Sequence, residues 1–190
     1  MQKERLKEDA DGKIERAEIL KRWAVENKTM LDIGAGPLAI IAARDFHCTV
    51  TNIDISEDAL MDAKRDAEEE AERIRFEIGD ATSLSYPDRS FDVVISYGVL
   101  HHIELDKRRK FIQEAYRVAK EKCIIAEFTP EGFDKIHAVS DFKAVDLNWL
   151  ERELNSLGEV DKYSGTLMKV YTLFLFTKNP FASQKPLQNF

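Results

Sequence analysis

The stretch covering residues 30–41 constrains this chain more than any other. It runs Met-Leu-Asp-Ile-Gly-Ala-Gly-Pro-Leu-Ala-Ile-Ile, which predicts an apolar strand, a glycine turn and an apolar helix. Glycine at positions 34 and 36 allows backbone conformations that other residues avoid, and it lets a ligand approach the main chain closely. Pro37 suits the first turn of a helix, where its missing N–H is no loss. This combination is typical of a site for a nucleotide-type ligand.

The glycine turn alone leaves the class of ligand open. Residues 34–39 satisfy the dinucleotide pattern G-x-G-x-x-G/A, and Asp54 lies at the distance expected of a carboxylate that binds ribose. These features allow a nicotinamide-dependent oxidoreductase. Asp32, just before the turn, is unfavourable beside a pyrophosphate and favourable beside a cationic ligand. Asp32 therefore favours a cationic ligand over a dinucleotide.

Size and composition exclude several other classes of protein. With 190 residues, 44% of them hydrophobic and 33% charged, the chain suits one soluble globular domain. No apolar run approaches the ~20 residues of a membrane span, and no apolar signal core follows the N-terminus, so we expect a cytoplasmic protein without a membrane partner. The net charge of −7 argues against a nucleic-acid partner. Cys48 and Cys123 lack metal-like spacing and are predicted to be buried thiols.

The chain divides into three parts. We expect a flexible, charged N-terminus at residues 1–12, a single domain at residues 13–177 and a loosely held tail at residues 178–190. In the first part of the domain, expected strands alternate with helices, which predicts a parallel sheet with helices on both faces. The expected strands cover residues 29–33, 48–54, 75–78, 91–96 and 123–128, and the helices cover 13–27, 37–43, 56–73 and 106–120.

The last part of the domain has a different pattern. Residues 129–145 show no clear period, and a helix is predicted at 146–157 with Gly158 as its C-cap. Residues 159–163 and 168–177 are predicted to form a closing pair of strands. Because irregular loops on a rigid scaffold often carry specificity, we expect residues 129–145 to cover the site.

Three carboxylates mark the ends of the first three expected strands. They are Asp32, Asp54 and Asp80. In a parallel sheet these ends share one edge, and ligands bind in the crevice outside them. A single Asp at a strand end is common, but three on successive strands, with the glycine turn between the first two, predict a cofactor site.

These motifs resemble the class I S-adenosylmethionine-dependent methyltransferases, whose first motif runs acidic-x-glycine-x-glycine at the end of the first strand. The resemblance covers about residues 13–177 and is specific up to residue 128. It implies an α/β fold, doubly wound and Rossmann-like, with a mostly parallel seven-stranded sheet, helices on both faces and an antiparallel closing strand. It also implies S-adenosyl-L-methionine as cofactor, which carries a sulfonium, an ammonium and no phosphate, in keeping with Asp32.

The resemblance implies a role for each cofactor-binding residue. Gly34, Ala35 and Gly36 would lie under the methionine part of the cofactor. Asp54 would accept hydrogen bonds from both ribose hydroxyls, and Ile55 would pack on the adenine.

Two further strand ends complete the implied cofactor site. Asp80, with the amide of Ala81, would bind the edge of the adenine, and the end of the fourth strand, at Ser96 and Tyr97, would bring backbone near the amino group of the cofactor. The sequence departs from the family at Leu38, where a third small residue is usual. This bulky side chain would crowd the methionine part.

Catalysis of methyl transfer depends mainly on alignment of donor and acceptor. A base is needed only if the acceptor must lose a proton. The candidates near the expected site are His101 and His102, followed by Glu127 and Tyr97. The histidines could equally be helix-end residues without a chemical role. As neighbours in sequence they are expected to point in different directions, so no metal site is predicted.

The sequence also bears on the methyl acceptor. Family members that methylate exocyclic or amide nitrogen often carry Asp/Asn-Pro-Pro-aromatic after the fourth strand, whereas this chain has Ser-Tyr-Gly-Val at residues 96–99. Together with the acidic charge, this favours a small-molecule acceptor, and His137 is a candidate for the acceptor side. Two alternatives stay open: the nicotinamide-dependent oxidoreductase, and a non-catalytic cofactor-binding protein on the same fold.

Overall fold

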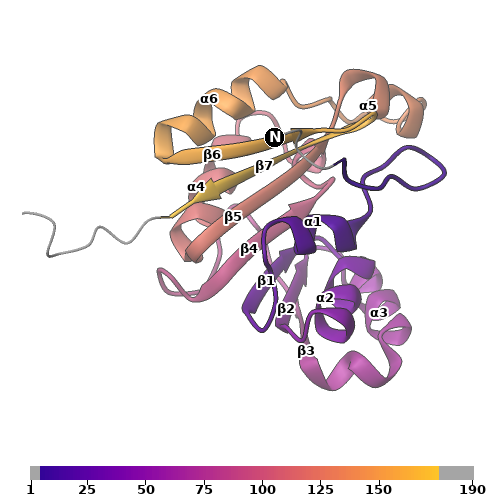
Figure 1. Cartoon of the computed structure of the whole chain (residues 1–190), viewed down its shortest axis with the longest axis vertical. Helices are drawn as coiled ribbons and strands as arrows, with labels where there is room; N and C mark the ends of the chain where they lie inside the picture. Colours follow the sequence, from indigo (N-terminus) through magenta and orange to yellow (C-terminus); the bar gives the residue numbers. More distant parts are fainter. Residues whose placement is uncertain (1–4, 176–190) are drawn as a thin grey trace, which may run out of the picture.

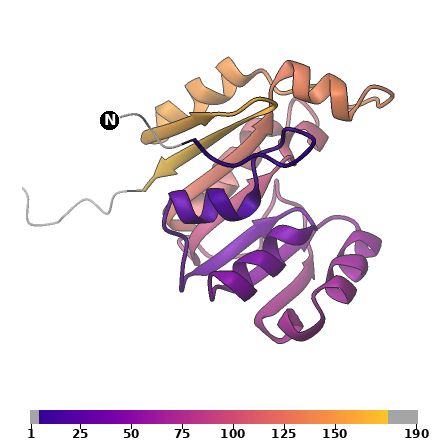
Figure 2. The same ribbon diagram turned by 45° about the vertical axis from the view of Figure 1, so that its right-hand side comes forward.

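The computed structural model describes residues 5–175, which form one seven-stranded sheet covered by helices on both faces (Figures 1 and 2). The strand order is β3-β2-β1-β4-β5-β7-β6. Strands β1 to β5 pair in parallel, and β7 lies antiparallel between β5 and β6. The expected doubly wound α/β fold with an antiparallel closing strand is thus confirmed.

The observed elements follow the predicted alternation closely. The strands are β1 (Thr29–Ile33), β2 (Thr49–Asp54), β3 (Ile74–Ile78), β4 (Phe91–Tyr97), β5 (Ala119–Phe128), β6 (Glu159–Ser164) and β7 (Met168–Phe174). The α-helices are α1 (Arg16–Arg22), α2 (Pro37–Asp45), α3 (Glu57–Asp66), α4 (Arg108–Val118), α5 (Pro130–Ile136) and α6 (Leu147–Leu157), and short 3₁₀ helices are η1 (Glu68–Arg73) and η2 (Leu100–His102).

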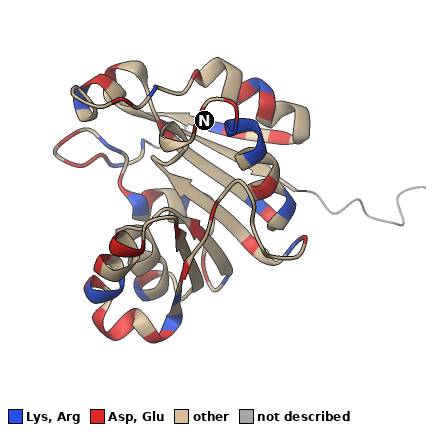
Figure 3. Ribbon diagram, turned by 180° about the vertical axis from the view of Figure 1, so that it is seen from behind, with Lys and Arg blue, Asp and Glu red and all other residues tan. Residues whose placement is uncertain are grey.

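The central strands are buried on both faces and supply two separate cores. Alternate residues of β1 point in opposite directions, so that Met30 belongs to the core that includes residues of α1 and α2, and Leu31 belongs to the core that includes residues of α4 and α6. Charged residues lie mainly on the helices and loops around the sheet (Figure 3). Both cysteines are buried and free, as predicted. Among residues 5–175, no helix has the length and apolarity to cross a membrane.

Two helices are shorter than their sequence patterns predict. The helix expected at 13–27 ends at Arg22, because Ala24 adopts a left-handed φ of 50° and the N–H of Val25 donates to the carbonyl of Leu20 (2.8 Å). This hydrogen bond and the left-handed Ala24 are those of a Schellman-type helix end, here formed without glycine. The helix expected at 56–73 begins as predicted, with the Ser56 hydroxyl accepting from the N–H of Ala59, but changes to 3₁₀ after residue 66.

The N-terminal segment differs from the expected flexible stretch over residues 5–12. Leu6 is buried, and its N–H donates to the hydroxyl of Tyr163 (3.0 Å) on β6. Glu8 accepts hydrogen bonds from both the N–H and the hydroxyl of Thr166. This segment therefore packs across the β6–β7 hairpin before the chain enters α1. Residues 1–4, the end of the predicted last strand and the predicted tail at 178–190 lie outside the described residues.

The stretch at 129–145 contains a helix that the sequence analysis missed. In α5, Pro130 occupies the first turn and the hydroxyl of Thr129 accepts from the N–H of Gly132 (3.1 Å). Its seven residues are too few to show a helical period. The helix α6 ends at Gly158 as predicted, but with an extended φ of 170°. A Cβ there would lie 3.0 Å from Leu173, so the glycine allows a close approach to β7.

Candidate functional site

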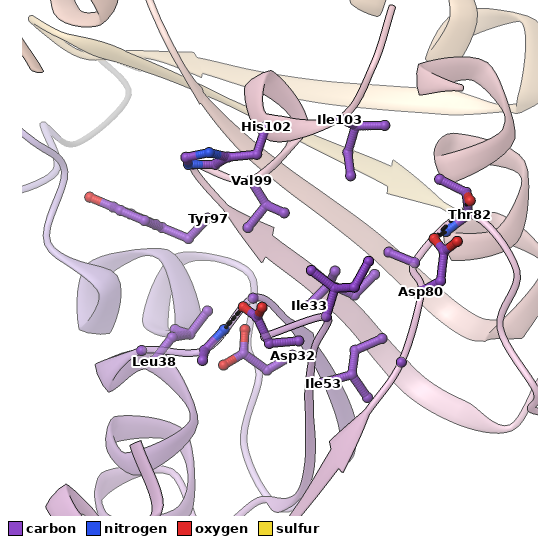
Figure 4. A pocket seen from close by; sticks show the side chains of 18 of the residues that line it. Asp32, Ile33, Leu38, Ile53, Asp80, Thr82, Tyr97, Val99, His102 and Ile103 are labelled. Carbon is purple, nitrogen blue, oxygen red and sulfur yellow. Dashed lines mark hydrogen bonds between the residues drawn. The ribbon is translucent and has the colours of Figure 1, made fainter. Parts of the chain in front are cut away.

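A cavity of about 570 Å³ opens at the carboxyl ends of the parallel strands (Figure 4). Its wall comes from the residues that follow β1, β2, β3 and β4, together with α1, η2 and part of the segment after α5. The strand order reverses between β1 and β4, so the cavity lies at a topological switch point, where doubly wound sheets bind ligands.

The two glycines of the turn serve different purposes. Gly34 has φ 101°, and a Cβ there would lie 2.5 Å from a methyl carbon of Val99. A Cβ at Gly36 would meet nothing within 4 Å. Both glycines and Ala35 line the cavity. Gly34 is thus required by the backbone and its packing, whereas Gly36 leaves open space toward a ligand.

Asp32 is a buried carboxyl group at the cavity wall, with 1% of its surface exposed. The amide of Asn52 donates to Asp32 Oδ2 (3.1 Å) and to the carbonyl of Gly34 (2.9 Å). Burial raises the pKa of Asp32 well above its usual range, and nearby Arg16 and the Asn52 bond act in the opposite direction. A cation bound beside Asp32 would favour its ionised form.

Asp54 connects the end of β2 to the glycine turn. Its Oδ2 accepts from the N–H of Ala35 (2.8 Å) and its Oδ1 accepts from the N–H of Ser56 (2.8 Å). Each carboxylate oxygen can accept a second hydrogen bond, so Asp54 retains capacity for ligand hydroxyls. Ile55 is 77% exposed and lines the cavity beside it.

Asp80 and Ala81 line the cavity at the end of β3. Asp80 Oδ1 accepts from the N–H (2.8 Å) and the hydroxyl (2.7 Å) of Thr82, as the dashed lines of Figure 4 show. These bonds to Thr82 lower the pKa of Asp80. Asp80 is therefore held ionised at neutral pH, on the side of the cavity that Asp54 and Ile55 also line.

At the end of β4 only one of the two expected residues reaches the cavity. Tyr97 lines it, while Ser96 is buried and does not. The Tyr97 hydroxyl donates to the carbonyl of Ile14 (2.7 Å), and burial raises its pKa to about 12. Tyr97 stays protonated at neutral pH and donates to a fixed acceptor, which argues against its role as a base.

The sequence analysis missed Arg16 as a site residue. It lies on α1, lines the cavity and places its guanidinium 4.2 Å from the centre of the Tyr97 ring. No local pattern distinguishes Arg16 from the other cations near it in the sequence, so only the tertiary fold identifies it. Leu38, noted as a departure, also lines the cavity with 3% of its surface exposed.

The two candidate bases differ in their access to the cavity. His102 lines it, whereas His101 is buried and does not. His101 Nδ1 lies 2.7 Å from Oε1 of the buried Glu127. Partial burial and the neighbouring His101 and His137 lower the pKa of His102 to about 4, so His102 is neutral at pH 7.

The expectation that the adjacent histidines point apart is wrong. The rings of His101 and His102 lie 4.1 Å apart between centroids, and the ring of His137 lies 4.6 Å from that of His101. Both histidines lie on the short 3₁₀ turn η2, and the segment after α5 packs against them through His137 and Phe142.

Residues 30–122 match a family model described as a methyltransferase domain. The chain carries a methyltransferase domain. Its fold and motifs are those of the class I S-adenosylmethionine-dependent methyltransferases, as the resemblance implied.

Curated relatives of this domain include named methyltransferases. Ajmaline N-methyltransferase of Rauvolfia serpentina is 31% identical over 96 residues, which are 48% of this chain and 32% of the relative. The ubiquinone/menaquinone biosynthesis C-methyltransferase of Rickettsia akari is 32% identical over 124 residues, which are 59% of this chain and 49% of the relative. The chain thus spans about a third to a half of the length of the curated relatives it matches.

Solved structures agree with the methyltransferase fold. The magnesium protoporphyrin IX methyltransferase of Synechocystis, solved with bound SAH, superposes with a TM-score of 0.65 at 19% identity, over 84% of this chain and 79% of its own length. A protein of Pyrococcus horikoshii gives 0.67 at 21% identity over 84% of this chain and 88% of its own. These matches do not favour the nicotinamide-dependent alternative.

Proposed function

We propose that this protein binds S-adenosyl-L-methionine in the cavity and transfers its methyl group to a small molecule. The observation that carries the proposal is the convergence of the glycine turn and three carboxylates, Asp32, Asp54 and Asp80, on one cavity. Their partners within the protein leave acceptor capacity free, because each oxygen of Asp54 accepts one of these hydrogen bonds and has a second lone pair, and both bonds of Asp80 go to Oδ1 and not to Oδ2. The cavity can thus offer negative charge and hydrogen-bond acceptors to a cationic nucleoside.

The proposed pose places the adenosine part at the ends of β2 and β3. Asp54 accepts from the ribose hydroxyls, Ile55 packs on the adenine, and Asp80 with the amide of Ala81 binds the adenine edge. The exposure of Ile55 supports this pose, because a large apolar side chain at a cavity rim gains from being covered.

The methionine part lies, in this proposal, between the glycine turn and α1. Residues 34–36 and the backbone at Tyr97 and Gly98 contact it, and these residues line the cavity. Asp32 stabilises the positive charge of the cofactor, and Arg16 pairs with the carboxylate of its methionine part. Ser96 does not line the cavity and therefore does not contact the cofactor in this proposal.

Bound S-adenosylmethionine supplies a methyl group already activated by the sulfonium. The protein then has to hold the acceptor in line and exclude water. We propose His102 as the group that faces the acceptor, since it lines the cavity and is neutral at pH 7. With a pKa of about 4 it is a weak base, so alignment contributes more than proton removal. His101 acts as a positioning residue through its ring contact with His102.

Two of the curated relatives, an ajmaline N-methyltransferase and a C-methyltransferase named for ubiquinone/menaquinone biosynthesis, support a small-molecule acceptor. We propose the same class here. A cytoplasmic location and the lack of a nucleic-acid partner stay predictions of the sequence.

Calorimetry with S-adenosylmethionine, S-adenosylhomocysteine and NAD(P) tests the cofactor. We expect both adenosyl compounds to bind and the dinucleotides not to bind. Tight binding of a dinucleotide alone would overturn the proposal. A screen of small-molecule acceptors then tests turnover, and cofactor binding without methylation of any acceptor would favour the non-catalytic alternative.

A further inference from the structure

Three of the four histidines of this chain gather at one place. His101 and His102 come from η2, and His137 follows α5. One ring nitrogen of each lies within 4.8 Å of one ring nitrogen of each of the others. The remaining histidine, His47, is exposed after α2 and takes no part. Two separate segments of the chain therefore bring three imidazoles together beside the cavity.

The hydrogen bonds of His101 are unequal at its two ring nitrogens. Nδ1 lies 2.7 Å from Glu127 Oε1, whereas Nε2 is buried and has no hydrogen-bond partner among residues 5–175. An unsatisfied buried polar atom is costly. A histidine with one nitrogen held by a carboxylate and the other free is arranged as metal-binding histidines are, because the carboxylate fixes the tautomer and strengthens the ligand.

A carboxyl group also lies against the cluster. Glu127 is 1% exposed and lies directly behind His101. Packing of the rings of His101 and His102 with Phe128, Phe133 and Phe142 is the alternative explanation, but it leaves Nε2 of His101 without a partner among the residues described.

We propose that His101, His102 and His137 bind one divalent transition-metal ion of the zinc type, with Glu127 orienting His101. Imidazole suits zinc, copper and nickel. Tetrahedral zinc with Zn–N bonds of ~2.0–2.1 Å needs ligand nitrogens roughly 3.4 Å apart, so nitrogens at the observed limit of 4.8 Å must approach each other by about 1.4 Å. His137 can supply this movement, because it is only partly buried and lies at the end of a short helix.

The site would have three protein ligands and one open position, which is the composition of catalytic zinc sites. Because His102 also lines the cavity, the ion would lie at the cavity wall. On the proposed methyl transfer, the open position would take an oxygen or sulfur atom of the acceptor and lower its pKa. This last step rests on the proposed function, whereas metal binding itself does not.

The test titrates metal-free, tag-free protein with Zn²⁺ by calorimetry and with Co²⁺ by visible absorption. We expect one ion per chain and the intense absorption bands of four-coordinate Co²⁺. His137→Ala should weaken Zn²⁺ binding at least tenfold, and Glu127→Gln should weaken it by about 10–100-fold. His47→Ala is the matched control and should leave the affinity unchanged. Circular dichroism of each variant establishes that it is folded.

The proposal is overturned if the folded wild-type protein binds no Zn²⁺, or if folded His137→Ala binds it as tightly as the wild type does. S-adenosylmethionine affinity is measured on the same samples. Zn²⁺ binding without cofactor binding would sink only the proposed function, and cofactor binding without Zn²⁺ binding would sink only the metal site.

Discussion

Asp54 has two roles at the scale of the single residue. It joins β2 to the glycine turn through the N–H of Ala35, and it keeps acceptor capacity directed to the cavity. The first role fixes the main chain that would contact the methionine part, and the second serves the ribose. One carboxylate thus couples the position of the turn to binding of the ligand.

Asp54→Ala should weaken S-adenosylmethionine binding by about 1–3 kcal/mol, because it removes a charged hydrogen-bond partner. Calorimetry measures the change. Asp66→Ala, an exposed carboxylate at the end of α3, is the control and should bind as the wild type does. An unchanged affinity in folded Asp54→Ala would exclude Asp54 from the site.

The two glycines of the turn should respond differently to alanine. Gly34→Ala places a Cβ against Val99 at φ 101°, and a strained backbone of this kind costs about 1–3 kcal/mol. We expect a lower melting temperature for Gly34→Ala. Gly36→Ala should keep the melting temperature and lose cofactor affinity, because its Cβ would enter open space toward the ligand. Equal melting temperatures and affinities for both variants would contradict this division.

At the scale of the element, α4 holds the segments on either side of it. Arg108 is buried, and its guanidinium donates to the carbonyls of His101, Ile103, Lys143 and Ala144. These bonds join η2 to the segment that follows α5. The relative position of His101 and His137 therefore depends on Arg108, although Arg108 donates to backbone carbonyls and not to the imidazole rings.

Arg108→Met should loosen the segment at 137–145, because four carbonyls lose their shared donor while the apolar stem of the side chain is kept. Hydrogen exchange should be faster there than in the wild type. Arg109→Met removes only a surface pair with Glu153 and is the control. Unchanged exchange at 137–145 would show that other contacts hold this segment.

The hydrogen bonds of Glu114, also on α4, make the stability of the fold depend on pH. Glu114 accepts from Arg117 and from the N–H of Leu84, and these bonds lower its pKa to about 2. A carboxyl whose folded pKa is depressed stabilises the fold above its unfolded value near 4.5, and this contribution is lost as pH falls toward 2. Glu114→Gln should therefore be less stable than the wild type at pH 7 by about 1–3 kcal/mol, and the gap should narrow below pH 4 in denaturant titrations.

The elements also differ in how far the sequence could predict them. The parallel strands and α2 have apolar runs bounded by glycine, aspartate or proline, and the order of these signals was sufficient to predict the sheet edge where Asp32 and Asp54 meet. The helix α5 is too short to show a period, and α1 ends at Arg22 because the chain turns at Ala24, although alanine favours helices. The turn η2 is set by tertiary contacts, so the direction of His101 and His102 could not be predicted from their adjacency.

At the scale of the whole molecule, the N-terminal segment connects the closing hairpin to the cavity. Residues 5–12 contact Tyr163 and Thr166, and the next residues bring Ile14 to the hydroxyl of Tyr97 and Arg16 to the cavity wall. These pairs are far apart in the sequence (83 residues for Ile14 and Tyr97), and no local pattern connects them. Sequence reasoning therefore identified the strand-end residues of the site but not Arg16.

Because α1 and the strand ends share the cavity, cofactor binding should stabilise both. A ligand that binds only the folded state slows the opening of the segments it contacts. We expect S-adenosylmethionine to slow hydrogen exchange in residues 14–20 and in residues 34–39. Helix α6 lies on the other core and contributes nothing to the cavity wall, so its exchange should not change. Protection limited to residues 34–39 would mean that α1 does not contact the cofactor, and Arg16 would then be excluded as the partner of its carboxylate.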